Sequence, residues 1–151
     1  MTTREEIKSR IEQDGIEFLL VQFVDLNGSA KVKMVPADEL DSCIDSGAGF
    51  AGAALFGLGQ GPHDHDMLAR VDLDSYTPLP WKPNTVRLAS NLYVDGEPHP
   101  YCARTNLKRV LDSAGEQGYV FNVGMEPEHF LVVRNEDGSI SPWDPGAVDH
   151  L

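Results

Sequence analysis

The N-terminal part of the chain shows helical and strand-like patterns of hydrophobic residues in turn. Thr3 and Glu6 fit a capping box, and Ile7 with Ile11 places one apolar stripe on the helix that follows. Gly15 can adopt the left-handed conformation that ends a helix. The sequence therefore predicts that the chain opens with a short helix.

Two strand-like runs follow, separated by Asn27 and Gly28. Residues 16–26 carry Ile, Phe, Leu and Val on both faces, which is typical of a central strand. The Asn-Gly pair supplies the positive backbone angles of a tight hairpin. In the returning strand, lysines alternate with apolar residues. We therefore expect Lys31 and Lys33 to face solvent while the apolar residues between them face the core.

The rest of the chain continues this mixture of helices and strands. Pro36 suits the first turn of a helix that ends at Gly47. A third helix is expected at residues 105–117, with Leu107, Val110, Leu111 and Ala114 on its buried side. Strands are expected at residues 68–76, 86–90, 92–94 and 122–133, whereas the prolines of residues 78–84 exclude regular pairing there.

Residues 47–66 form an exception, because they are dense in glycine and carry no charge before Asp64. They show neither a helical nor a strand period and therefore predict a long loop. A loop of this length that is rich in Phe, Leu and Ala is expected to dock on another surface, and a flexible glycine linker is the alternative. The run His63–Asp66 has metal-binding side chains, but such runs in loops favour the interpretation of solvated residues.

Glu126 and Glu128 are two charged residues in the last predicted strand. Side chains two residues apart on a strand project from the same face, about 7 Å apart along the backbone. The two carboxylates therefore repel each other unless something compensates them. A divalent cation with hard oxygen ligands would do so, and a solvated strand face is the alternative.

The charge of the chain narrows the classes of partner. The net charge is -12 and no basic cluster is present, which argues against nucleic acid and anionic membranes. No signal peptide and no apolar run long enough to cross a bilayer is recognised, so we expect a cytoplasmic protein. Cys43 and Cys102 match no metal or redox spacing and are interpreted as ordinary thiols, with a disulfide as the alternative.

The predicted elements are distributed unevenly along the chain. A sheet that could be complete precedes residue 98, whereas one helix and one strand follow it. We therefore expect an α+β chain with a small N-terminal domain at residues 1–98 and the incomplete start of a larger domain at residues 99–151.

The segment GMEPEHFLV resembles the GxExEFFL strand of glutamine synthetases. The order before it is similar to the N-terminal region of that family: a helix, a long strand, the VDLNGSAKVKMVP hairpin, a glycine-rich loop and the VDLDSYTPLPW segment. The resemblance covers essentially the whole chain. The stretches GAGFAGAALFG and PLPW are most similar to the branch of type III glutamine synthetases and γ-glutamylmethylamide synthetases.

The resemblance implies a β-grasp N-terminal domain followed by the first helix and strand of a truncated catalytic α/β domain. It implies an ATP-dependent ligase that joins glutamate to ammonia or a small alkylamine through γ-glutamyl phosphate. Mg²⁺ or Mn²⁺ would serve as cofactor, with Glu126 binding the metal that bridges the ATP phosphates and Glu128 the metal nearer glutamate. It also implies a homo-oligomer whose active sites lie between subunits, with the glycine-rich loop reaching the neighbouring site.

Phe50, Ala51 and Gly52 begin a stretch, FAGAA, where typical members of the family carry FDGSS. The Asp of that motif helps to hold ammonium, so its loss suits an amine that bears carbon, such as methylamine. The family's other metal ligands and its ATP and glutamate contacts are absent from this sequence. We therefore expect the chain alone to be inactive.

Two other functions remain open. The main alternative is a non-catalytic β-grasp assembly or regulatory module that binds full-length subunits through its loop and sheet edge. Hydrolysis with Glu126 and Glu128 as acid and nucleophile ranks below both. Glycosidase carboxylates face each other across the substrate, whereas these two lie along one strand.

Overall fold

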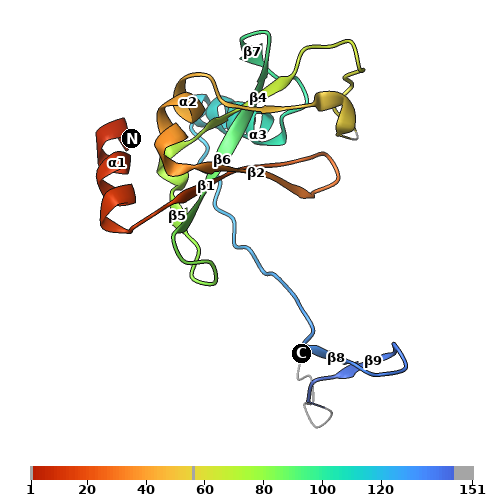
Figure 1. Ribbon diagram of the computed structural model, residues 1–151. Helices are drawn as coiled ribbons and strands as arrows, with labels where there is room; N and C mark the ends of the chain where they lie inside the picture. The colour runs from red at the N-terminus through yellow and green to blue at the C-terminus, as the bar shows by residue number, and fades with distance from the viewer. Residues whose placement is uncertain (1, 56, 145–151) are drawn as a thin grey trace. The chain divides into compact units, whose positions relative to one another are not determined.

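Figure 1 shows the computed structural model, in which residues 2–55 and 57–144 are described. The chain divides into two compact units after Tyr119. The first unit contains a mixed sheet with helices, and the second contains a two-stranded sheet. None of the helices in the described ranges is long and apolar enough to cross a membrane.

The sheet of the first unit has the strand order β2-β1-β6-β4-β3, and β5 and β7 pair with β6. Its strands are β1 (Phe18–Val24), β2 (Ala30–Pro36), β3 (Ala48–Phe50), β4 (Met67–Val71), β5 (Thr77–Pro78), β6 (Thr85–Val94) and β7 (Glu97–Pro98). β1 and β6 run parallel, while the neighbouring pairs formed by the other strands are antiparallel. The central position predicted for residues 16–26 is confirmed, because β1 lies between β2 and β6.

The helices of this unit are α1 (Arg4–Gln13), α2 (Leu40–Asp45) and α3 (Ala103–Glu116), with 3-10 turns at Ala37–Glu39, Gly52–Ala54 and Leu73–Ser75. The capping box is confirmed. The Glu6 amide donates to the Thr3 hydroxyl at 3.2 Å, and the Thr3 amide donates to the Glu6 carboxylate at 2.6 Å. The helix predicted from Pro36 begins later, because Pro36 is the last residue of β2.

One face of the sheet is buried beneath α1 and α2 (Figure 1). Ile7 of α1 and Leu40 of α2 pack with Leu19 of β1 and with Val86 and Leu88 of β6. A second cluster lies further along the sheet and consists of Val21, Phe23, Cys43, Ala48, Leu58, Met67, Ala69, Leu92 and Cys102. Cys43 and Cys102 are both buried free thiols in these clusters, as the sequence predicts.

The β1–β2 hairpin leaves Val32 and Met34 of β2 outside the core, contrary to prediction. Lys31 and Lys33 lie opposite buried residues of β1 and therefore share its buried face. Val32 and Met34 lie on the other face, and each is 50% exposed. Lys33 is nevertheless exposed and Lys31 partly exposed, so the prediction that is wrong is that the apolar residues between the lysines face the core. The Lys31 ammonium lies 3.2 Å from the Asp25 carboxylate.

The later strands differ from prediction in their boundaries. β6 runs unbroken from Thr85 to Val94, where the sequence predicts two separate strands. The strand predicted at residues 68–76 ends at Val71. Pro78 pairs with Val86 even though prolines were expected to exclude pairing in this segment. It is tolerated because β5 is only two residues long and pairs only with β6 among the described strands.

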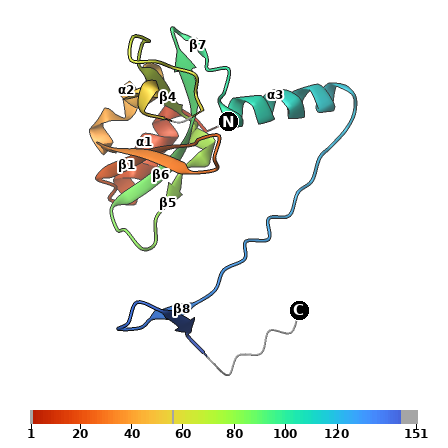
Figure 2. The same ribbon diagram turned by 90° about the vertical axis from the view of Figure 1, so that its right-hand side faces the viewer.

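Helix α3 extends away from the sheet (Figure 2), and its apolar side is open to solvent. Leu107 and Val110 are each 59% exposed and Leu111 is 40% exposed, so the burial predicted for this side is wrong in this structure. The helix does have the expected amphipathic pattern and nearly the expected length. The helical periodicity of the sequence predicted the helix. It gave no information on whether another part of the protein covers the apolar side.

The second unit contains β8 (Val132–Arg134) and β9 (Ile140–Pro142), joined by a turn in which Gly138 has a φ of +83°. Residues 120–131 belong to no helix or strand (Figure 2). The strand predicted at residues 122–133 is therefore wrong over most of its length. The end of the predicted second domain, residues 145–151, lies outside the described residues. The predicted domain boundary at residue 98 stays a prediction.

Candidate functional site

The glycine-rich segment at residues 47–66 is more regular than the long loop that the sequence predicts. Its first residues form β3, which pairs with β4 so that Ala48 lies opposite Ala69 and Phe50 opposite Met67. A 3-10 turn, Gly52–Ala54, follows. Edge pairing of this kind requires only three residues and therefore leaves little periodic signal in the sequence.

Phe50 is held against the body of the first unit. Its ring meets that of Phe23 edge-on, with centroids 5.0 Å apart and an interplanar angle of 87°. The Lys33 ammonium lies 5.4 Å from the centroid of the Phe50 ring and donates a hydrogen bond to the Gly49 carbonyl. Ala51, which follows, is exposed. The residues expected to serve a neighbouring subunit therefore begin at a point fixed by this chain's own side chains.

Gly52 is buried because the loop folds back on itself at this point. A Cβ atom added to Gly52 would lie 1.8 Å from the Gln60 side-chain oxygen. The Gln60 amide nitrogen donates to the His65 carbonyl at 2.9 Å. Close packing of Gln60 against Gly52 thus links the start of the loop to its end. A side chain at residue 52 would displace Gln60 from its hydrogen bond with the His65 carbonyl.

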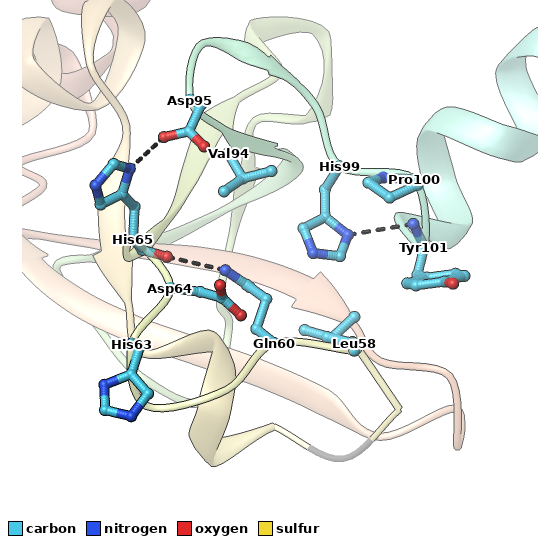
Figure 3. A pocket seen from close by; sticks show the side chains of 11 residues that line it. Leu58, Gln60, His63, Asp64, His65, Val94, Asp95, His99, Pro100 and Tyr101 are labelled. Atoms are coloured by element: carbon cyan, nitrogen blue, oxygen red, sulfur yellow. Dashed lines mark hydrogen bonds and ion pairs between the residues drawn. The ribbon is translucent and has the colours of Figure 1, made fainter.

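Figure 3 shows a pocket of about 360 Å³ at the end of this loop. Leu58 and Val94 supply apolar surface, while Gln60, Asp64, His65, Asp95, His99 and Tyr101 supply polar groups. The pocket lies between the glycine-rich loop and the β6–β7 turn. Three members of the His-Asp run, His63, Asp64 and His65, thus line the pocket, although all three remain exposed.

His65 and Asp95 tie the loop to the β6–β7 turn. The His65 Nδ1 atom is hydrogen-bonded to a carboxylate oxygen of Asp95. This hydrogen bond, together with the negative charge of Asp95, raises the pKa of His65. Both side chains are largely exposed, at 80% and 66%. The pair is therefore strongest when His65 is protonated, and solvent screens it.

His99 is the buried polar residue of the pocket, with only 3% of its surface exposed. Burial lowers the pKa of its imidazole, which favours the neutral form. The Tyr101 backbone amide donates to Nδ1 at 3.2 Å, so the neutral ring carries its proton on Nε2. Figure 3 shows this ring directed toward the pocket, where it can offer one hydrogen-bond donor.

Glu126 and Glu128 lie in the second unit, within residues 120–131, and both are exposed. Neither makes a hydrogen bond or an ion pair with any residue that the structure describes. Their carboxylates are the hard oxygen donors that Mg²⁺ and Mn²⁺ prefer. Within the described ranges, however, no group of three or more His, Cys, Asp or Glu side chains could hold a metal ion. The two carboxylates are therefore suitable ligand types for a divalent metal, but two ligands are too few to complete a site.

Three residues that the sequence analysis did not select prove central to the loop and hairpin. Asp25 is 5% exposed and accepts hydrogen bonds from the amides of Asn27 and Ser29. Its position before Asn-Gly was a usable turn signal. Gln60 and His99 gave no comparable signal, because their contacts with His65 and Tyr101 follow no turn or capping motif in the sequence.

Comparison with known proteins finds relatives over nearly the whole chain. The glutamate–methylamine ligase of Methyloversatilis universalis is 39% identical over 142 residues, which are 93% of this chain and 32% of that protein. A glutamine synthetase of Pyrococcus abyssi is 35% identical over 141 residues, which are 93% of this chain and 31% of that protein. The chain spans about a third of the length of these curated relatives. No family model matches it.

Solved structures extend the similarity from sequence to fold. A ligand-free structure of GmaS matches 99% of this chain and 34% of its own, with a TM-score of 0.77 and 34% identity. A complex of GmaS with ADP matches 72% of this chain and 25% of its own, with a TM-score of 0.69 and 41% identity. The mixed α/β architecture described above is thus shared with these proteins.

Proposed function

We propose that this chain, a homologue of glutamine synthetases and of glutamate–methylamine ligase, forms part of an ATP-dependent ligase that joins glutamate to an amine. The observation that carries the proposal is the 39% identity to a glutamate–methylamine ligase over 93% of the chain. The strand order, with one parallel pair at its centre, supports the β-grasp assignment for the N-terminal domain. We further propose that the intact protein is a cytoplasmic homo-oligomer.

The proposed reaction has two steps. The γ-carboxylate of glutamate attacks the γ-phosphorus of ATP to form γ-glutamyl phosphate and ADP. The amine then attacks the acyl carbon, so that an amide forms, phosphate leaves and the amine loses a proton. Mg²⁺ or Mn²⁺, when bound, would neutralise negative charge on the transferring phosphoryl group.

In this proposal Glu126 and Glu128 are metal ligands of the intact enzyme. Their exposure leaves both carboxylates available to a cation, and further ligands must come from beyond the described residues. Because two carboxylates do not complete a metal site, the 151-residue chain is expected to be inactive alone. The assembly-module alternative predicts inactivity of the intact protein as well.

The glycine-rich loop is proposed to contribute to amine selection at a neighbouring active site. Phe50, Ala51 and Gly52 form its start, and Ala51 offers an exposed methyl group in place of a carboxylate. Methyl groups suit the carbon of methylamine, whereas bare ammonium is better held by a carboxylate. We therefore propose methylamine, or another small alkylamine, as the preferred substrate.

Amine competition in the intact ligase tests this proposal. The expected wild-type result is a higher kcat/KM for methylamine than for ammonia. Ala51→Asp should shift the ratio toward ammonia by about tenfold, within the range that one specific polar contact can supply. Ala53→Asp adds the same charge two residues later and serves as the control. A wild-type enzyme that uses ammonia far more efficiently than methylamine would refute the proposed substrate.

A further inference from the structure

Lys33 connects two strands that lie at opposite ends of the sheet. β2 and β3 are the first and last strands of the order β2-β1-β6-β4-β3. The Lys33 ammonium on β2 nevertheless donates a hydrogen bond to the Gly49 carbonyl on β3. The sheet must therefore curl until its two edges approach each other, and this lysine spans the remaining gap.

The same ammonium also contacts the first aromatic ring of the glycine-rich loop. It lies 5.4 Å from the centroid of the Phe50 ring, within the range of a cation–π interaction. The Phe23 ring meets Phe50 edge-on at 5.0 Å. Phe50 is thus held by two neighbours, one apolar and one charged, immediately before the exposed Ala51.

We infer that Lys33 is a positioning residue for the glycine-rich loop. By holding the Gly49 carbonyl and the Phe50 ring, it determines where Ala51 and the residues after it emerge from the sheet. The loop is therefore ordered within this chain, before any partner covers it. An effect of Lys33 on amine binding rests on the proposed function of the loop. The positioning of the loop by Lys33 does not.

Amide hydrogen exchange in the 151-residue chain directly tests whether Lys33 positions the loop. Lys33→Met keeps the aliphatic stem but removes the charge. It should raise exchange rates at residues 49–55 by about three- to tenfold, as expected for the loss of interactions at an exposed site. Lys33→Arg retains a cation and should stay close to wild type.

Lys82→Met is the matched control. Its ammonium contacts the Met34 sulfur at 3.8 Å, on the opposite face of β2. The control should leave exchange in the loop unchanged. Unchanged loop exchange in Lys33→Met would overturn the inference. A rise that is equal in β6 and in the loop would also overturn it, because it would indicate global destabilisation.

Steady-state kinetics of the intact ligase then test the consequence. Lys33→Met should raise KM for the amine about three- to tenfold and leave KM for glutamate and kcat near wild type. If loop exchange rises while the amine KM stays constant, the positioning role stands and the loop's proposed role in amine binding fails. The two claims are therefore judged by separate measurements.

Discussion

At the scale of single residues, Asp25 shows how one buried carboxylate organises a turn. It accepts hydrogen bonds from the Asn27 amide at 2.9 Å and the Ser29 amide at 3.0 Å, and it pairs with Lys31 at 3.2 Å. Gly28 adopts a φ of +79°, which allows the chain to turn back into β2. The Asp25 carboxylate therefore stabilises the turn only while it is ionised.

Asp25→Asn should lower stability and remove part of its pH dependence. Burial opposes ionisation of Asp25, but the bonds from Ser29, Lys31 and Asn27 outweigh it and hold the pKa of Asp25 below its ordinary value of 3.8. A lowered pKa means that the stabilisation is present above the unfolded-state pKa and is lost as pH falls through the folded-state value.

Urea denaturation between pH 2 and pH 7, by circular dichroism, measures this effect. The wild-type midpoint should fall more steeply below about pH 4 than that of Asp25→Asn. Asp38→Asn, an exposed carboxylate near the end of β2, is the control with the same change of charge. Parallel pH profiles for wild type and Asp25→Asn would contradict the role assigned to Asp25.

Sequence reasoning at this scale succeeded where the signal is local. Thr3 and Glu6 are three residues apart, and their capping box follows from that spacing alone. The direction of Lys31 and Lys33 could not be predicted in this way. It depends on Asp25 and on the Gly49 carbonyl, and only the folded sheet brings these groups to the lysines.

At the scale of elements, an ion-pair group fixes the start of α3 to the sheet. Asp72 follows β4, and its carboxylate accepts hydrogen bonds from Arg104 and from Lys108, the latter at 2.9 Å. Asp72 is only 15% exposed. Burial disfavours its ionisation, yet Lys108 and Arg104 together keep the pKa of Asp72 below its ordinary value. With its apolar side open, α3 is attached to the sheet by this group and by the buried Cys102 that precedes the helix.

Asp72→Asn should loosen α3 without unfolding the sheet. The expected loss is about 0.5–1 kcal/mol, because both cations are well exposed and solvent screens the pairs. Amide exchange at residues 103–110 should accelerate about two- to fivefold, while exchange in β6 stays constant. Asp112→Asn removes an exposed carboxylate from α3 itself and is the control. Equal exchange in Asp72→Asn and wild type would show that the group does not hold the helix.

The strand predicted at residues 122–133 shows a limit of element prediction. Its Val, Phe and Leu residues favour extended structure, and β8 does form at Val132–Arg134. A strand is stable only when another strand satisfies its backbone hydrogen bonds. β9 provides three such residues, and Trp143 donates a backbone hydrogen bond to the Leu131 carbonyl, whereas no described strand pairs with residues 120–130. The composition of residues 122–133 predicted an extended conformation. It could not show whether a neighbouring strand is present to pair with these residues.

At the scale of the whole molecule, the two units differ in how much hydrophobic core each contains. The first has buried clusters on a seven-stranded sheet within the described residues, whereas the second has a short two-stranded sheet. The mixed α/β class followed from the order of helical and strand-like runs. The hydrogen bond between Lys33 of β2 and the Gly49 carbonyl of β3 was not predicted, because the curl of the sheet that brings these residues together leaves no local pattern.

The central claim is that Glu126 and Glu128 bind the divalent metal of a glutamate–amine ligase, and calorimetric titration of the intact protein with Mn²⁺ tests it most directly. Glu126→Gln and Glu128→Gln should each weaken Mn²⁺ binding by about tenfold or more, since each removes a charged oxygen ligand. Glu136→Gln, in the exposed turn between β8 and β9, should bind as wild type does. Wild-type Mn²⁺ affinity in both ligand variants would contradict the account.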